Sequence, residues 1–209
     1  MITAIFLLIK NYKSVYFIKV YKIKTFSYRI KQRWQKMCKS FIPFGHAKSI
    51  YEIDPSFYTK HGVKTLFMDL DNTLDSYKAK EPKQETIELI KKLQANNITP
   101  VVISNNKASR VSGYVSKLGI EFLASARKPF AKRLLNEISK RNLKKDEVML
   151  VGDQMMTDVL AGKHAGIRVV LTEKIVKEDQ FTTHFNRLID RPIRRHHRKK
   201  GNLRNWRDL

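Results

Sequence analysis

The chain has 209 residues, which is enough for one domain with a substantial core and too few for two large domains. Its 42 Lys and Arg outnumber its 19 Asp and Glu and give a formal net charge of +23. The single cysteine, Cys38, excludes an internal disulfide and fits a reducing compartment. Residues 1–50 carry 11 basic and no acidic residues, and residues 187–209 carry nine basic residues against two acids. Such cationic ends attract polyanions, either anionic lipid or nucleic acid, although they can also serve solubility alone.

The first 36 residues interleave Lys and Arg with aromatic and aliphatic residues and show no clean period. Their apolar run, residues 2–9, ends at Lys10 and is shorter than the ~20 residues that span a bilayer. It also lacks the preceding positive charges and the cleavage site of a secretory signal. We expect a cytoplasmic protein. Residues 1–36 are then an extension that contacts a membrane surface or RNA, or the product of a start codon assigned upstream of Met37.

From residue 63 onward, short apolar runs alternate with segments of helical periodicity, which is typical of a parallel α/β fold. Strands are predicted near residues 64–69, 99–104, 121–124, 147–151 and 168–171. Helices are predicted over about residues 85–93, 111–118 and 156–165, with another that opens at Pro129. The predicted domain covers residues 37–180, and residues 181–209 form a basic tail.

Residues 66–74, LFMDLDNTL, place two acids at the end of an apolar run. Asp69 and Asp71 are separated by one residue, so their side chains lie on the same side at the end of the predicted strand. Ligands bind at the carboxyl edge of a parallel sheet, where one carboxylate can attack and hold a metal while its neighbour moves a proton. Aspartate at such a junction is also common turn chemistry, so the spacing alone leaves both interpretations open.

Three further polar groups follow apolar runs or lie in loops, in chain order. Ser104 and Asn105 end the run of residues 98–103, Lys128 precedes a helical stretch, and Asp153 and Asp158 follow the run of residues 147–151. Each group alone has an ordinary explanation as a turn residue, a surface charge or a helix cap. Together, and in this order, they indicate a catalytic site.

This order resembles the haloacid dehalogenase (HAD) superfamily of phosphohydrolases. The segments DLDNTL, SNN, ARKP and GDQ-x-x-TD, followed by a basic tail that contains FNR, are similar to the YqeG-type phosphatases of subfamily IIIA. These are related to the phosphatidylglycerophosphate phosphatases of mitochondria and plastids. The resemblance covers about residues 37–198. Asp75 departs from the motif, which more often continues with an apolar residue, and its effect on metal or substrate preference is open.

The resemblance implies a HAD-like, Rossmannoid three-layer α/β sandwich with a parallel sheet in the order 5-4-1-2-3. Strand 1 then lies between strands 2 and 4, so Asp69, Ser104 and Asp153 would converge at adjacent strand ends. Inserted cap domains select substrates in this superfamily. Only 30 residues separate Thr73 from Ser104 and only 23 separate Ser104 from Lys128, and one helix and one strand occupy each interval. We therefore expect an open site with no cap domain.

The resemblance also implies residue roles. Asp69 is the nucleophile that forms an aspartyl-phosphate, and Asp71 protonates the leaving alcohol and then activates water. Mg²⁺ would be held by the Asp69 side chain, the Asp71 backbone carbonyl and Asp153, with Asp158 in support. Lys128 would offset the charge of the transferring group. The substrate phosphate and its loop would be held by Ser104, backbone N–H groups near Asn105, and Thr73.

The leading functional interpretation is a Mg²⁺-dependent phosphatase that acts on a lipid head group, phosphatidylglycerophosphate in phospholipid synthesis, because an open site admits membrane-bound substrates. A soluble phosphatase for nucleotides or sugar phosphates is one alternative. A nucleic-acid-binding or ribosome-associated protein that keeps only the fold is another, but intact motifs argue against it. We expect Pro192 to break or kink any helix in the tail, which leaves a short amphipathic turn and then a flexible basic run that holds the domain on the inner face of an anionic membrane.

Overall fold

The computed structural model describes residues 39–176 and 181–209. Ser40–Leu209 forms one compact unit. The expectations for residues 1–36, as an extension or as an artefact of the assigned start, concern residues outside this described part of the chain. Among the described residues, no helix combines the length and the hydrophobicity needed to cross a membrane.

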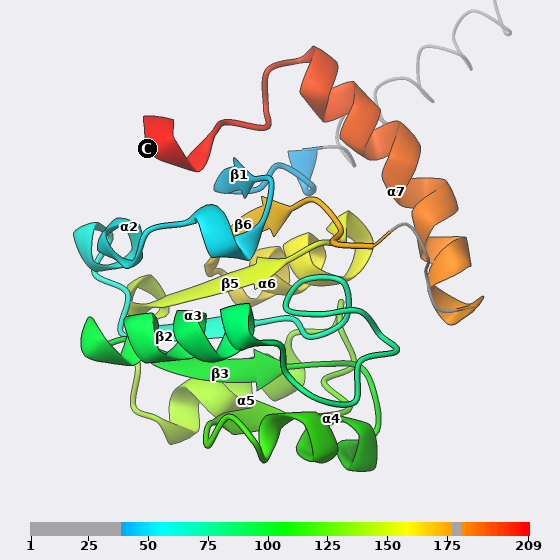
Figure 1. The fold of residues 1–209 in the computed structure, drawn as a ribbon. Helices are drawn as coiled ribbons and strands as arrows, with labels where there is room; N and C mark the ends of the chain where they lie inside the picture. The colour runs from blue at the N-terminus through cyan, green and yellow to red at the C-terminus, as the bar shows by residue number, and fades with distance from the viewer. Residues whose placement is uncertain (1–38, 177–180) are drawn as a thin grey trace, which may run out of the picture. The chain divides into compact units, whose positions relative to one another are not determined.

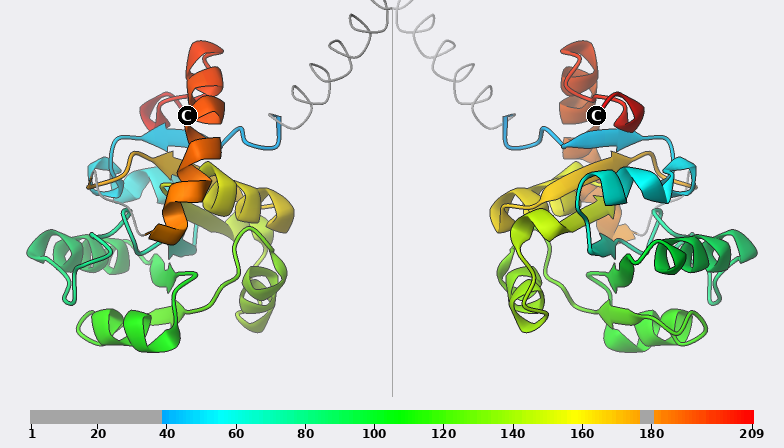
Figure 2. Two further views of the ribbon diagram at one scale, coloured as in Figure 1. Left: turned by 90° about the vertical axis from the view of Figure 1, so that its right-hand side faces the viewer. Right: turned by 90° about the vertical axis from the view of Figure 1, so that its left-hand side faces the viewer.

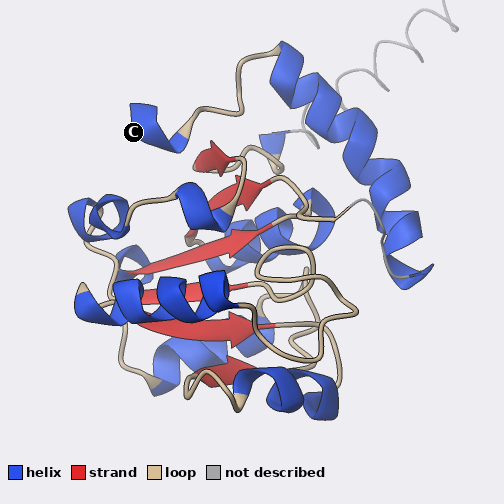
Figure 3. Ribbon diagram, in the orientation of Figure 1, coloured by secondary structure: helices blue, strands red, loops and turns tan. Residues whose placement is uncertain are grey.

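The centre of the unit is a six-stranded, all-parallel sheet in the order β1-β6-β5-β2-β3-β4 (Figures 1 and 3). Five strands are those expected from the sequence, and β6-β5-β2-β3-β4 is the predicted order. The sixth strand, β1, pairs with β6 at the edge and was missed, because GHA carries no apolar run. The bounds are β1 Gly45–Ala47, β2 Thr65–Met68, β3 Thr99–Ile103, β4 Glu121–Leu123, β5 Val148–Gly152 and β6 Arg168–Thr172.

Helices cover both faces of this sheet, which confirms the three-layer α/β class (Figure 2). The third predicted helix begins at Lys132 instead of Pro129, and the fourth is a π-helical turn, Met155–Val159, that continues as α6. The α-helices are α2 Pro55–Lys60, α3 Gln84–Ala95, α4 Ala108–Val115, α5 Lys132–Lys140, α6 Leu160–Ala165 and α7 Phe181–Lys199.

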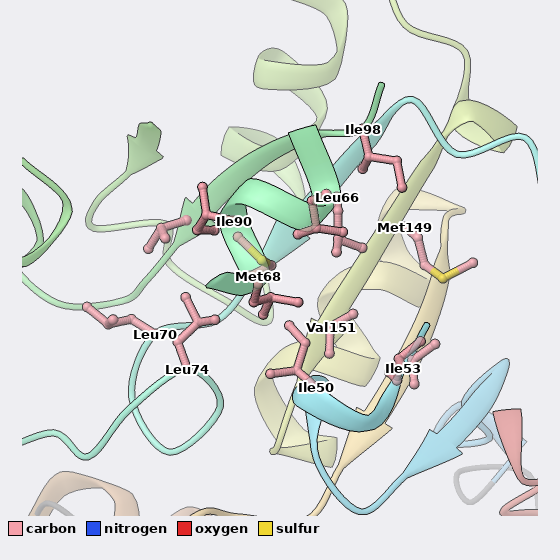
Figure 4. Close-up of a cluster of buried hydrophobic side chains, with 14 of the residues drawn as sticks. Ile50, Ile53, Leu66, Met68, Leu70, Leu74, Ile90, Ile98, Met149 and Val151 are labelled. Atoms are coloured by element: carbon pink, nitrogen blue, oxygen red, sulfur yellow. The ribbon is translucent and has the colours of Figure 1, made fainter. Parts of the chain in front are cut away.

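Alternate residues of the central strands face two separate cores. Leu66 and Met68 of β2 join a cluster under α2, α3 and α4 (Figure 4), whereas Phe67 joins a cluster under α5 and α6. This alternation follows from the pleat of a strand, and a strand buried on both faces reads as a continuous apolar run. At the carboxyl ends of the central strands, the apolar residues stop and polar residues follow.

The expectation that the C-terminal segment is a short turn followed by a flexible basic run is wrong. Residues 181–199 form one helix with Pro192 inside it. Proline inside a helix costs about 3 kcal/mol. Ile193, next to it, is fully buried in the core under α5 and α6, and burial of such a side chain contributes about 1.5–3 kcal/mol. Asp190 and His197 are also buried on this side of the helix. Tertiary packing therefore outweighs the local signal.

The last residues of the chain also pack on the domain instead of forming a flexible run. His46 of β1 donates its backbone N–H to the Arg204 carbonyl at 2.8 Å, and the chain ends in a 3-10 turn at Trp206–Asp208. A Cβ at Gly45 would lie 2.9 Å from Cδ1 of Leu209, so glycine permits this close approach.

Candidate active site

Three strand ends bring the predicted polar residues together. Strand β2 pairs with β3 on one side and with β5 on the other, with Met68 opposite Val102 and Val151. Asp69 follows β2, Ser104 follows β3, and Asp153 follows β5. Because parallel strands end at one edge of a sheet, the three side chains meet there.

The centre of the site is a cluster of three buried carboxylates. Asp69, Asp153 and Asp158 each offer one oxygen, and these oxygens lie within 4.8 Å of one another. Lys128 lies among them with a side chain only 3% exposed. Its Nζ donates to Asp69 Oδ1 at 2.6 Å, to Asp158 Oδ1 at 2.7 Å and to the Ile103 carbonyl at 3.2 Å. One lysine therefore contacts two of the three acids.

Burial dominates the electrostatics of this cluster. It raises the pKa of Asp69 well above its usual value; Lys128 opposes this shift, and the neighbouring carboxylates add to it. Burial also raises the pKa of Asp153 to about 6, against the effect of Arg187. For Lys128, burial lowers the pKa, but Asp158 and Asp69 together outweigh burial and raise it. The lysine therefore stays protonated as the shared partner of Asp69 and Asp158.

The residues present fit a hard divalent cation. Asp153 Oδ1 is buried and has no hydrogen-bond partner among the described residues, although burial of an unpaired carboxylate oxygen is costly. It belongs to the same three-acid cluster as Asp69 and Asp158. Mg²⁺ is typically bound through one or two carboxylates, with substrate phosphate and water completing the shell. A cation at this cluster would give the buried Asp153 Oδ1 the partner that it lacks among the described residues.

Asp71 lies outside the three-acid cluster. Its carboxylate accepts hydrogen bonds from Asn106 Nδ2 at 2.7 Å and from Arg110 Nη2 at 3.3 Å. Arg110 also donates to the Tyr77 carbonyl at 3.1 Å, so the guanidinium connects Asp71 to the following loop. Neither Asn106 nor Arg110 was predicted as a partner of Asp71, because the loop after β3 and α4 come near this acid only in the folded chain.

The predicted phosphate-binding residues lie around Asp69 and Lys128. Ser104 is buried, and its Oγ accepts the Asn106 N–H at 3.1 Å. The Asn105 side chain accepts the Lys128 N–H at 2.7 Å and donates to the Lys128 carbonyl at 2.9 Å. Thr73 Oγ1 donates to Asp69 Oδ2 at 3.5 Å. The Asn105 amide is thus used to hold the Lys128 loop.

Asp75, which was expected to stand apart from the motif, makes its contacts outside the acid cluster. Its carboxylate accepts hydrogen bonds from the Tyr114 hydroxyl at 3.1 Å and from the Ser76 N–H at 3.0 Å. It is not one of the three clustered acids. Asp75 therefore ties the loop after β2 to α4.

Comparison with known proteins gives the family. A family model described as haloacid dehalogenase-like hydrolase matches residues 9–172, so it begins before the start near residue 37 that the motifs indicated. A curated relative from Bacillus subtilis (strain 168), named Probable phosphatase YqeG, is 33% identical over 165 residues, which are 79% of this chain and 96% of that protein. The chain belongs to the haloacid dehalogenase-like hydrolase family. It is a phosphatase, its resemblance to the YqeG-type proteins is confirmed, and its acid cluster suits the Mg²⁺ cofactor of HAD phosphatases.

Solved structures of similar fold include 3-deoxy-D-manno-octulosonate 8-phosphate phosphatases. The protein from Moraxella catarrhalis, in complex with magnesium ion, phosphate ion and KDO, is 17% identical with a TM-score of 0.41, covering 48% of this chain and 63% of that one. The protein from Yersinia pestis is 12% identical with a TM-score of 0.44, covering 61% of this chain and 83% of that one.

In this HAD-family chain, α7 brings two arginines of the predicted basic tail into contact with Asp153. Arg187 donates to Asp153 Oδ2 and, from Nη1, to the Asp153 carbonyl at 3.2 Å. Arg194 Nη2 donates to the same carbonyl at 2.7 Å. The signal that could have revealed them is the spacing of Arg187, Asp190 and Arg194, which puts all three on one helical face. Pro192, which disfavours a helix, hides this spacing in the sequence.

Gly152 allows the Asp158 carboxylate to lie against the end of β5, inside the acid cluster. A Cβ at this position would lie 2.3 Å from Cγ of Asp158, which is too close for any real contact. We therefore expect Gly152→Ala to displace the Asp158 carboxylate, lower turnover on the order of 100-fold and destabilise the fold by about 1–3 kcal/mol. Steady-state kinetics and urea denaturation measure the two effects.

The matched control is Gly113→Ala, at an exposed position of α4 where a Cβ would meet no atom within 4 Å. Alanine there should stabilise the helix by about 1 kcal/mol and leave turnover unchanged. If Gly152→Ala keeps its turnover and its stability, as Gly113→Ala should, the close approach of Asp158 to the end of β5 is not needed for catalysis or for folding.

Proposed function

We propose that this HAD phosphatase hydrolyses a phosphomonoester through an aspartyl-phosphate on Asp69, and that its substrate is phosphatidylglycerophosphate. The observation that carries the mechanism is the buried contact between Asp69 and Lys128 beside Asp153 and Asp158. A carboxylate at a strand end, paired with a fixed cation, is positioned to attack phosphorus while the charge that develops is offset.

Two transfers complete the reaction. Asp69 attacks phosphorus, the bond from phosphorus to the alcohol oxygen breaks, and Asp71 gives its proton to that oxygen. Asp71 then takes a proton from water, which attacks phosphorus and releases inorganic phosphate from Asp69. Asn106 and Arg110 donate to the Asp71 carboxylate, and the positive charge of Arg110 favours the ionised form that accepts a proton from water in the second transfer.

The remaining site residues would bind Mg²⁺ and the substrate phosphate and offset the charge of the reacting groups. The Asp69 and Asp153 carboxylates would hold Mg²⁺, with Asp158 in support, and its charge offsets the repulsion between a carboxylate and a phosphate dianion. Lys128 offsets charge on the transferring group, and Ser104 binds a phosphate oxygen. Thr73 and Asn105 keep the two loops in place through the Asp69 and Lys128 contacts already described.

An open site supports a large substrate. Between β2 and β3 the described chain forms a loop and α3, and between β3 and β4 it forms α4. Neither interval contains an inserted domain that could cover the acids. A head group attached to a membrane can therefore approach the carboxyl edge of the sheet.

A small cationic pocket beside the acids supports a substrate with two phosphates. Its volume is about 150 Å³, and four basic side chains line it together with Glu173 and Asp190: Lys174, Arg187, Arg191 and Arg194. Arg187 also contacts Asp153, so the pocket adjoins the acid cluster. Phosphatidylglycerophosphate carries a phosphodiester close to its terminal phosphomonoester, and the pocket would take the phosphodiester while Asp69 attacks the terminal group.

The test is turnover of the purified full chain on phosphatidylglycerophosphate in mixed micelles, beside nucleoside monophosphates, sugar phosphates and p-nitrophenyl phosphate. We expect kcat/KM for the lipid to exceed every soluble ester by at least about 100-fold, roughly 3 kcal/mol of added transition-state binding. A soluble ester that matches the lipid would replace the proposed substrate. No turnover of any ester would reject the proposed mechanism on Asp69 as well as the proposed substrate.

The exposed cations of α7 predict binding to an anionic surface. Arg191, Arg195 and Lys199 are exposed on this helix, and each contributes about 1 kcal/mol near an anionic leaflet, screened by salt. The triple replacement of Arg191, Arg195 and Lys199 with Gln should abolish flotation with phosphatidylglycerol-rich vesicles at low salt. Substitutions test this better than a deletion of residues 191–209, because such a deletion would also remove buried Ile193 and His197.

The control removes the same charge elsewhere, by replacing the exposed residues Lys80, Lys91 and Lys92 with Gln. If both triple variants lose vesicle binding to the same extent, the net charge of the protein, and not the position of α7, accounts for the binding. Equal binding to neutral vesicles, or tighter salt-sensitive binding to RNA than to lipid, would contradict a role for α7 at the cytoplasmic membrane surface.

A further inference from the structure

We propose that α7 is part of the catalytic centre, with Arg187 as the positioning residue that sets Asp153 for metal binding. This inference rests on the part of the proposed function that makes Asp153 a metal ligand, and it is independent of the lipid substrate. Figure 1 shows α7 on the side of the sheet where the arrowheads of β5 and β6 point, and the left view of Figure 2, which faces this side, agrees.

Arg187 holds Asp153 at two points. One nitrogen of its guanidinium donates to Asp153 Oδ2, and the other donates to the Asp153 carbonyl. This grip fixes both the backbone and the rotation of the carboxylate. The remaining oxygen, Oδ1, has no hydrogen-bond partner among the described residues and is buried. Arg187 therefore determines which oxygen of Asp153 is left for a cation.

Two more α7 residues hold the loop that follows β5. Asp190 accepts the backbone N–H groups of Met155 and Met156, each at 2.9 Å, where the π-helical turn that carries Asp158 begins. Arg194 donates to the carbonyls of Asp153 and Thr172, so it ties the end of β5 to the end of β6. One helix thus fixes the loop that supplies two of the three clustered acids.

Arg187 and Asp190 are buried, which indicates that their contacts do more than attach α7 to the surface of the domain. The Arg187 side chain is 9% exposed and that of Asp190 is 2% exposed. Exposed ion pairs contribute little, whereas removing one partner of a buried pair leaves an uncompensated charge. Groups that orient a metal ligand typically change metal affinity by 10-fold to 100-fold when they are lost. A helix that served only to cover the core would require none of these contacts to converge on Asp153.

The experiment measures Mg²⁺ affinity without substrate. Magnesium chloride is titrated into the purified full chain, and the dissociation constant is taken from the increase in unfolding free energy with Mg²⁺ concentration. We expect Arg187→Met to weaken Mg²⁺ binding by about 10-fold to 100-fold. Arg187→Lys keeps the charge but cannot bridge the carboxylate and the carbonyl as a fork, so it should recover only part of the loss.

The matched control is Arg198→Met, on the same helix. Arg198 donates to the Glu173 carboxylate at 2.8 Å and is exposed, so this variant loses the same charge and one arginine–carboxylate pair without touching Asp153. Its Mg²⁺ affinity should equal that of the unmodified chain. A common loss in Arg198→Met and Arg187→Met would overturn the proposal, because net charge would then explain it.

Two further variants keep the result decisive. If Arg187→Met does not fold, Asp190→Asn and Arg187→Lys, which retain size and hydrogen bonding, must still weaken Mg²⁺ binding by several-fold. An Arg187 variant that is less stable but binds Mg²⁺ with unchanged affinity shows a purely structural role and overturns the proposal. Asp153→Asn tests the metal-ligand role of Asp153 separately from the positioning role of Arg187. Unchanged Mg²⁺ affinity in that variant would refute the metal-ligand role of Asp153 in the proposed function.

Discussion

Asp69→Asn is expected to abolish phosphoester turnover, by at least about 10³-fold, while the domain stays folded. An amide is neither a nucleophile nor an anionic metal ligand, but its oxygen can still accept the hydrogen bond from Lys128 Nζ. Removing one charge from three buried carboxylates also relieves repulsion, so the free energy of unfolding should not fall. Steady-state kinetics and circular dichroism measure the two quantities. EDTA should abolish turnover of the unmodified chain in the same way, and added Mg²⁺ should restore it.

Asp75→Asn is the control for this substitution. Asp75 lies in the same loop, but its carboxylate contacts Tyr114 and Ser76 instead of the acid cluster. This variant should retain most of its turnover. Substantial turnover in Asp69→Asn, or turnover that survives EDTA, would reject the aspartyl-phosphate mechanism.

Lys128→Met is expected to remove turnover and also to destabilise the metal-free fold by about 3–5 kcal/mol. The ammonium group is the shared partner of Asp69 and Asp158, both buried, and methionine leaves their charges uncompensated. Mg²⁺ should recover part of the lost stability, because a divalent cation at the cluster offsets the same charges. Urea denaturation with and without Mg²⁺ measures both effects.

The control is Lys132→Met, at an exposed position at the start of α5, four residues along the chain. Its stability should change by less than about 0.5 kcal/mol, as is usual for surface substitutions. A metal-free Lys128→Met protein as stable as the unmodified chain would mean that the acids are not held together by the lysine.

The three clustered acids and Lys128 could be predicted from the sequence to different extents. Asp69, Lys128 and Asp153 were predictable because each follows a buried strand or lies in a loop of a recognisable motif. Asp158 was expected only to support the metal, yet it lies inside the cluster and pairs with Lys128 at 2.7 Å. Its position depends on Gly152 and on the π-helical turn, which the predicted α-helix over residues 156–165 did not include.

The sequence by itself determined the five central strands, their polar ends and the order of the motifs, because burial on both faces and the carboxyl edge of a parallel sheet leave local patterns. The tertiary structure decided the rest. Arg187 and Arg194 contact Asp153 across 34 and 41 residues of chain, and no local period reports such a contact. The local signals of the C-terminal segment, many basic residues and Pro192, indicated a flexible tail. The burial of Ile193 and Asp190 outweighs those signals and makes the segment a helix beside the acids.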